Sequence, residues 1–365
     1  MRYMKKAAVL IVILINTLNY NCFSASSEFT QEPYKILFIG SSYFNGYDMP
    51  GLFEDLVNNS GKTVYIDRQI TNGLYLEDHA NSISTEAKIN EKDWDYVILQ
   101  GVGALVAYPD YYTHHPVYPA LVALQNKISE NCDSTKMVFC LPWAFEDGMT
   151  WVQGWTDTYE DMQIKIYENT LRYLDDLDFV IAPVGWAWNT VLKEKNYPLH
   201  YLHLSDWNHP SLRGSYLMAC TIYSTIYQES SVEIQYYGGL PEENANYFQT
   251  VASNTVLDSL DLWNITVKNP LITEFPIPNE FNLYQNYPNP FRTNTQINYE
   301  IQKRALVEIA LYDIFGKRYA NLVNENKLPG SYSVSFNASN LKSGIYSYRI
   351  KIGNQYQEKK ILLMK

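Results

Sequence analysis

Short apolar runs alternate with longer amphipathic stretches between residues 35 and 227. The runs are four or five residues long and rich in β-branched and aromatic types, which predicts strands buried on both faces. Strands are expected at Lys35–Ile39, Thr63–Ile66, Tyr96–Leu99, Met137–Leu141 and Phe179–Ala182. Helices are expected at Leu52–Val57, Pro119–Ser129, Tyr159–Leu174 and Ser211–Tyr227. This alternation predicts a five-stranded parallel sheet covered by helices on both faces.

The pattern changes after residue 265. Three prolines between residues 266 and 278, with no sustained periodicity, indicate a linker. Beyond it, apolar and polar residues alternate with period two, which predicts a small antiparallel β-sandwich. Its strands are expected at Thr295–Ile301, Val307–Tyr312, Gly330–Phe336 and Gly344–Ile350. The chain thus divides into an α/β domain over 33–265, a linker over 266–278 and an all-β domain over 279–365.

The first 25 residues have the pattern of a signal peptide. A basic start is followed by the apolar stretch Ala7–Leu18 and then by the small residues Ser24–Ser26. The apolar stretch is shorter than the roughly 20 residues that span a membrane. A retained membrane anchor and lipidation at Cys22 are the alternatives, although the residues before Cys22 are Asn19–Asn21 instead of the small residues that usually precede a lipidated cysteine.

Removal of the signal peptide would leave Cys132, Cys140 and Cys220, an odd number in a compartment where disulfides form. Cys132 and Cys140 flank an expected strand, and eight extended residues span about 26 Å, too far for a disulfide. We therefore expect buried free thiols.

Charge separates the two domains. Residues 26–278 carry 13 Lys and Arg against 33 Asp and Glu, whereas residues 279–365 carry 12 against 6. An acidic main domain repels polyanions, so nucleic acid is not expected as a partner.

Candidate catalytic residues follow the expected strands. Ligands of open parallel sheets bind beyond the carboxyl ends of the strands, so polar residues there should share one crevice. Such residues occur at Gly40–Ser42, Thr71–Gly73, Gln100–Gly101 and Pro142–Trp143.

A second motif, Asp206-Trp207-Asn208-His209-Pro210, precedes the last expected helix. Asp206 can accept the Nδ1 proton of His209, which leaves Nε2 free to take a proton from a serine. Ser42 is the matching serine, because it follows Gly40 in a turn at the end of the first strand. Each motif alone also fits a surface ion pair, a helix cap or a tight loop.

Together, and in this order, the motifs resemble the SGNH (GDSL-like) hydrolase family between about Tyr34 and Tyr227. The resemblance implies a three-layer α/β/α, flavodoxin-like domain and a secreted serine esterase that needs no cofactor. It assigns Ser42, Asp206 and His209 as the catalytic triad. It also assigns the backbone N–H groups of Ser42 and Gly73 to the oxyanion hole.

Two departures from the family pattern bear on the site. Ser41 replaces the usual Asp before the nucleophile, so Ser41 is an alternative nucleophile. The family's Gly-x-Asn-Asp is absent after the third strand, where the chain has Leu99-Gln100-Gly101. Our hypothesis is that the Gln100 carboxamide replaces the missing oxyanion Asn. A catalytically inactive, surface-displayed carbohydrate-binding protein is the alternative that this departure favours.

His200, His203, Asp206 and His209 recur every three residues, which raises the question of a metal site. Steps of three residues turn the side chains about 60° apart on a helix and to alternate faces on a strand. We therefore expect no metal site. The alternative is a coiled loop, which could still bring these four side chains together around a metal ion.

Several tryptophans follow strand ends or adjoin the expected triad: Trp143, Trp186, Trp188 and Trp207. Their flat faces could stack on sugar rings or line an acyl pocket, so we expect substrate binding there, with O-acetyl groups on carbohydrate as the candidate ester.

The all-β domain resembles the C-terminal sorting domain of type IX secretion (Por secretion type A). The resemblance rests on Phe281–Phe291, Val307–Gly316, Gly330–Tyr332, Ser343–Tyr346 and Lys359–Lys365. It implies an immunoglobulin-like sandwich, recognition by the type IX secretion machinery, and a secreted or cell-surface location. An accessory sandwich that binds carbohydrate is the alternative.

Overall fold

The computed structural model describes residues 32–108, 116–152, 154–174, 176–194, 198–266, 281–313, 317–353 and 355–364. The expected signal peptide and most of the expected linker lie outside these ranges.

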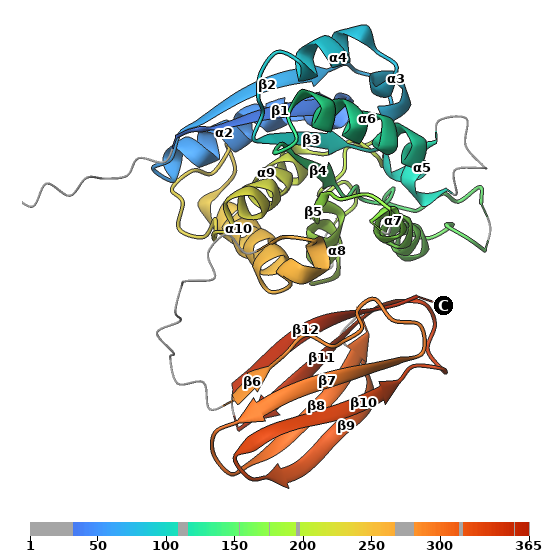
Figure 1. Ribbon diagram of the computed structural model, residues 1–365, viewed down its shortest axis with the longest axis vertical. Helices are drawn as coiled ribbons and strands as arrows, with labels where there is room; N and C mark the ends of the chain where they lie inside the picture. The colour runs from blue at the N-terminus through green and yellow to red at the C-terminus, as the bar shows by residue number, and fades with distance from the viewer. Residues whose placement is uncertain are drawn as a thin grey trace, which may run out of the picture. The chain divides into compact units, whose positions relative to one another are not determined.

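The α/β domain contains one parallel sheet in the order β2-β1-β3-β4-β5 (Figure 1). Its strands are β1 (Tyr34–Gly40), β2 (Val64–Ile70), β3 (Tyr96–Gln100), β4 (Lys136–Cys140) and β5 (Val180–Ala182). All five predicted strands are confirmed. The interior strands β1 and β3 have no accessible surface from Ile36 to Ile39 and from Val97 to Leu99, which explains their continuous apolar sequence.

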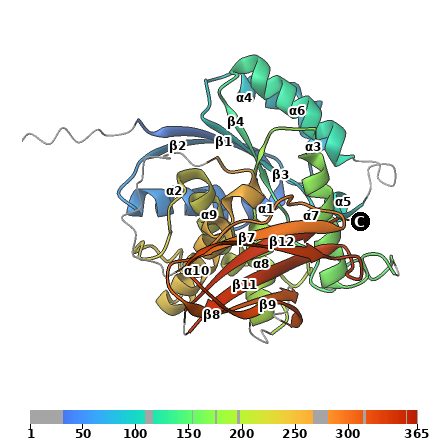
Figure 2. The ribbon, with the colours of Figure 1, turned by 60° about the horizontal axis from the view of Figure 1, so that its bottom comes forward.

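Helices cover both faces of this sheet (Figure 2). One face carries α2 (Met49–Asn59) and α9 (Leu212–Tyr227), which pack on each other, and α10 (Glu242–Leu257) packs against α9. On the other face α6 (Val117–Asn131) packs against the two short helices α3 (Leu76–Ala80) and α4 (Ile83–Ile89).

Three more helices belong to this domain. They are α5 (Gly103–Ala107), α7 (Tyr159–Tyr173) and α8 (Val184–Glu194). Helix α5 packs against α7, and α8 packs against α9 and α10. The four helices predicted from the sequence are therefore confirmed, and the three-layer α/β/α arrangement is confirmed with them.

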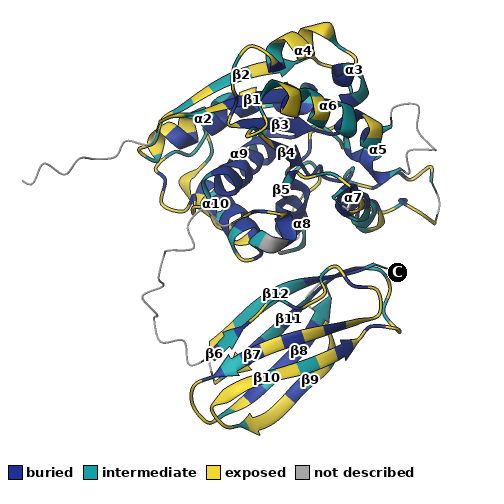
Figure 3. Ribbon diagram, in the orientation of Figure 1, coloured by how far each residue is buried: buried dark blue, intermediate teal, exposed yellow. Residues whose placement is uncertain are grey.

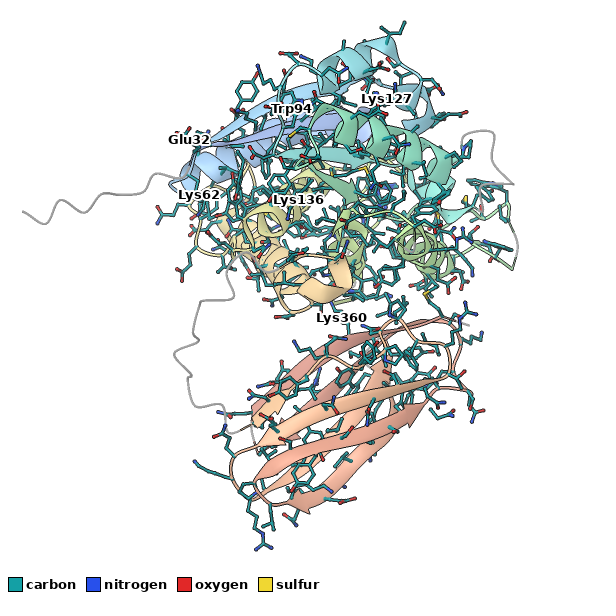
Figure 4. The ribbon with its side chains drawn as sticks, in the orientation of Figure 1. Glu32, Lys62, Trp94, Lys127, Lys136 and Lys360 are labelled. Carbon is teal, nitrogen blue, oxygen red and sulfur yellow. The ribbon has the colours of Figure 1, made fainter. Side chains whose placement is uncertain are left out.

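The core of the α/β domain lies on the two faces of the sheet, where the strands and the inner sides of the helices are buried (Figure 3). Trp94 illustrates the packing just before β3 (Figure 4). Its side chain is buried, and its indole N–H donates a hydrogen bond of 3.0 Å to the carbonyl of Ile89.

The all-β domain consists of two antiparallel sheets, in the orders β10-β7-β6 and β12-β11-β8-β9. Their strands are β6 (Phe281–Leu283), β7 (Asn294–Ile301), β8 (Ala305–Asp313), β9 (Arg318–Lys327), β10 (Gly330–Asn337), β11 (Gly344–Ile352) and β12 (Gln355–Leu363). Alternate residues of both sheets, among them Ile297, Ile309 and Ile350, form one buried cluster. The predicted β-sandwich is confirmed.

Two further features were expected from the sequence. Within the described residues all three cysteines are free thiols; Cys140 and Cys220 are buried, but Cys132 is half-exposed because it caps the end of α6. No helix in the described part of the chain is long and apolar enough to cross a membrane.

Candidate active site

The turn after β1 places Ser42 at the carboxyl end of the sheet. Strand β1 ends at Gly40, and the one-turn helix α1 (Ser42–Asn45) begins two residues later. A Cβ at Gly40 would lie 2.9 Å from the ring of Phe44 and 3.0 Å from Oε1 of Gln100, so the turn requires glycine. The Ser42 side chain is only half-buried and is available for chemistry.

Ser42, His209 and Asp206 form a continuous chain of hydrogen bonds. Oγ of Ser42 lies 2.7 Å from Nε2 of His209, and Nδ1 of His209 lies 2.6 Å from Oδ2 of Asp206. When Nδ1–H donates to Asp206, the other ring nitrogen, Nε2, is the one that can accept the proton of the Ser42 hydroxyl. The structure thus brings together the three residues of the predicted triad, which come from opposite ends of the domain sequence.

The other oxygen of Asp206 accepts two backbone hydrogen bonds, from His209 N–H at 3.0 Å and Asn208 N–H at 3.1 Å. Partial burial acts to raise the pKa of Asp206, but these bonds and the His209 side chain outweigh it and hold the pKa below its usual value. Asp206 is therefore ionised at neutral pH and fixes the orientation of the imidazole.

The loop that carries Asp206 and His209 is anchored to the segment after β4. The Glu146 carboxylate accepts hydrogen bonds from the backbone N–H of His200 at 2.6 Å and from its Nδ1–H at 2.8 Å. The N–H of Glu146 donates to the carbonyl of Trp207 at 3.0 Å. Both His200 and Trp207 have left-handed backbone conformations, with φ of 62° and 61°. These anchors hold a strained loop in the shape that the triad requires.

His203 adds a buried anchor, since its Nε2–H donates to the carbonyl of Ala144 at 3.0 Å. Burial lowers the pKa of His203, so the ring is neutral. His200 and His203 are thus engaged by different partners. In the described ranges no group of three or more His, Cys, Asp or Glu side chains could hold a metal ion.

The loop after β2 carries Gly73, the second expected source of an oxyanion N–H. Gly73 has a φ of 82°, and a Cβ there would meet open space, so glycine is required by the backbone conformation alone. Two bonds tie the loop to the nucleophile turn: Thr71 N–H to the Gly40 carbonyl at 3.1 Å, and the Asn45 side-chain amide to that of Asn72 at 3.0 Å.

Gln100 makes contacts that differ from the expected ones. Its Oε1 accepts hydrogen bonds from both the N–H and the hydroxyl of Ser41, each at 3.0 Å, and its Nε2 donates to the Gly101 carbonyl at 2.6 Å. The buried carboxamide is therefore joined to the nucleophile turn. The same contacts engage the buried Ser41 hydroxyl with Gln100, whereas the Ser42 hydroxyl contacts the base, which favours Ser42 over Ser41 as the nucleophile.

The four tryptophans expected to bind substrate do not share one environment. The rings of Trp143 and Trp188 are buried and stack on each other 4.1 Å apart, and Trp186 is buried against Tyr167. These three rings fill the interior and offer no exposed face to a sugar, and their expected role in substrate binding stays a prediction. Trp207 is 52% exposed and adjoins Asp206, so a substrate can reach its ring.

Sequence reasoning missed three polar or aromatic residues that hold the site. Tyr43 contacts His209, Glu146 anchors the triad loop, and the buried His79 donates from Nε2 to the Gly40 carbonyl at 3.0 Å. For Tyr43 the signal was its position next to Ser42. Glu146 and His79 lie on loops and short helices without a motif, so nothing in the sequence pattern marks them.

Comparison with known proteins identifies the all-β domain. Residues 285–364 match the family described as "Secretion system C-terminal sorting domain". The predicted sorting domain is thus confirmed, and the protein is exported to the cell surface or beyond. No curated protein matches the chain.

Solved structures of other proteins are similar to part of this chain. A DUF4886 family protein from Bacteroides uniformis is 20% identical with a TM-score of 0.52, over 62% of this chain and 95% of that one. A putative SGNH hydrolase from Slackia heliotrinireducens is 20% identical with a TM-score of 0.44, over 53% and 99%. An acetyl xylan esterase, AlAXEase, is 19% identical with a TM-score of 0.40, over 53% and 99%. The likeness to the Bacteroides uniformis protein establishes a shared fold.

Proposed function

We propose that this protein is an exported serine esterase of the SGNH type, with Ser42 as nucleophile, His209 as general base and acid, and Asp206 as the residue that orients His209. The observation that carries the proposal is the unbroken hydrogen-bond chain from Ser42 Oγ through His209 to Asp206. A binding protein that had lost catalysis would have no need of this alignment.

In the first step Ser42 Oγ attacks the ester carbonyl while Nε2 of His209 takes the hydroxyl proton. The tetrahedral intermediate then collapses, the bond to the alcohol breaks, and His209 returns the proton to the departing alcohol oxygen. In the second step His209 takes a proton from water, the resulting hydroxide attacks the acyl-enzyme, and the carboxylic acid leaves as Ser42 regains its proton.

The negative oxygen of each intermediate requires hydrogen-bond donors. We assign this role to the N–H groups of Ser42 and Gly73. Ser42 is the first residue of α1, where backbone N–H groups have no partner within the helix. Gly73 lies on the loop that is bonded to the nucleophile turn through Thr71.

The proposed substrate is an O-acetyl group on a carbohydrate, because the exposed ring of Trp207 adjoins the triad and offers a stacking surface beside the ester. The test is acetate release by the full chain from acetylated xylan, acetylated pectin and acetylated oligosaccharides, with Ser42→Ala as the blank. Release that depends on Ser42 supports the proposal. Hydrolysis of a small ester without acetate release from any glycan would support the proposed esterase activity and reject the carbohydrate substrate.

A further inference from the structure

Tyr43 follows the nucleophile directly, yet its side chain contacts the base. The Tyr43 and His209 rings are stacked, with centroids 5.0 Å apart and planes 28° apart. Successive residues of a helix project about 100° apart. The short helix α1 thus directs the Ser42 hydroxyl to the edge of the imidazole and the Tyr43 ring to its face.

The hydroxyl of Tyr43 makes a second contact with the same loop, since it donates a hydrogen bond to Oδ1 of Asn208. Asn208 is held on its backbone as well: its carbonyl accepts a bond of 2.9 Å from Nε1 of Trp143, and its N–H donates to Asp206. The Trp143 ring packs edge-on against Tyr43, with centroids 5.3 Å apart. Tyr43 therefore lies between the base and the aromatic core.

Tyr43 is only 4% exposed, so its ring does not form part of an open substrate surface. Burial raises the pKa of its hydroxyl well above the usual value. The hydroxyl therefore stays protonated and can act as a hydrogen-bond donor over the whole pH range in which an esterase works.

We propose that Tyr43 is a positioning residue for ester hydrolysis: it holds the imidazole of His209 in line with Ser42 and stabilises the ring while it carries the proton. An aromatic face is negative and attracts a cation placed over it, and this attraction is stronger where water is excluded. The inference rests on the proposed function, because it concerns the protonated state of His209 that forms only during acyl transfer.

The experiment compares Tyr43→Leu and Tyr43→Phe with the wild-type chain, with p-nitrophenyl acetate as substrate over pH 5 to 9. Leu removes the ring and keeps an apolar side chain, and we expect kcat to fall about 5- to 30-fold with KM nearly unchanged. The acid limb of the profile should move down by roughly 0.5 to 1 pH unit, because the imidazolium is less stable. Phe keeps the ring and should leave the acid limb in place.

Tyr65→Leu, at an exposed tyrosine of β2, is the matched control and should leave kcat and the acid limb of the pH profile unchanged. A Tyr43→Leu variant with wild-type kcat and acid limb, or with a raised KM alone, would overturn the inference. If circular dichroism shows that Tyr43→Leu does not fold, Tyr43→Met replaces it. An active Ser42→Ala variant would reject Ser42 as the nucleophile and with it the proposed mechanism, whereas an inactive Ser42→Ala beside a normal Tyr43→Leu rejects only the role of Tyr43.

Discussion

Replacement of Gln100 separates two roles that this residue could have. Its Oε1 accepts hydrogen bonds from the N–H and the hydroxyl of Ser41, and its Nε2 donates to the carbonyl of Gly101. Ser41 and Gln100 are both buried. If these bonds order the nucleophile turn, Gln100→Ala leaves the two Ser41 donors without a partner. A buried unsatisfied donor costs about 1–3 kcal/mol, so the loss of the partner of both donors should lower the free energy of unfolding by roughly 2–6 kcal/mol.

An oxyanion donor would behave differently. Its loss lowers kcat by about 10²- to 10³-fold and has little effect on folding. Gln100→Glu distinguishes the two roles, because a buried Glu has a raised pKa and is protonated. Its carbonyl oxygen can still accept from Ser41 and its O–H can donate to Gly101, but it has no second hydrogen for an oxyanion.

We expect Gln100→Glu to keep kcat within about 10-fold of wild type at pH 6. Ser41→Ala removes one of the two hydrogen bonds between Ser41 and Gln100, and it should lower the free energy of unfolding by about 1 kcal/mol. The measurements are urea unfolding and hydrolysis of p-nitrophenyl acetate. A loss of 10²-fold or more in Gln100→Glu with unchanged unfolding would refute the turn-ordering role and restore Gln100 to the oxyanion hole.

Three further predictions follow from the site. Burial lowers the pKa of both His79 and His203, so the native rings stay neutral at a pH at which the unfolded chain already binds protons, below about pH 6.5. The free energy of unfolding should therefore be largest above about pH 6.5 and should fall as the pH decreases through the lowered pKa values. A urea midpoint at pH 5 equal to or above that at pH 7.5 would contradict this. Glu146→Ala should lower the free energy of unfolding by roughly 1–3 kcal/mol and reduce kcat, because His200 loses both hydrogen bonds to the carboxylate. Glu130→Ala, at an exposed position of α6, is the control. Equal unfolding curves for the two variants would contradict the anchoring role of Glu146. Trp207→Ala should raise KM for an acetylated oligosaccharide by about 5-fold or more and leave KM for p-nitrophenyl acetate unchanged, since stacking contributes roughly 1 kcal/mol. An unchanged KM for the oligosaccharide would show that the exposed ring has no part in sugar binding.

The sequence predicted the elements whose apolar residues form a clear pattern, either a continuous run or a regular period. The interior strands β1, β3 and β4 are buried on both faces and therefore have continuous apolar sequences, whereas the edge strand β2 has only a short apolar start. Helix α10 was missed because its buried side includes Gln249 and Ser253, which form hydrogen bonds with the chain around residues 231–236, so its apolar period is weak. Strands β9 and β12 were missed because most of β9 and the first half of β12 are polar and not buried.

The triad could be predicted because its residues occur in fixed order at the ends of recognisable elements. The supporting contacts could not, because they depend on where loops place individual side chains. Trp143 shows the difference: a tryptophan after a strand can face a crevice or fill the core, and here it stacks on Trp188 and donates to Asn208. Gln100 has the right chemistry for an oxyanion donor, but Ser41 is the partner that its oxygen contacts.

The most direct test of the account is hydrolysis of p-nitrophenyl acetate by the full chain, by Ser42→Ala and by Ser41→Ala. The hydrogen bond between Ser42 and His209 predicts that Ser42→Ala abolishes hydrolysis, while Ser41→Ala retains it at a reduced rate. Undiminished hydrolysis by Ser42→Ala, or its loss in Ser41→Ala alone, would contradict the assignment of Ser42 as the nucleophile.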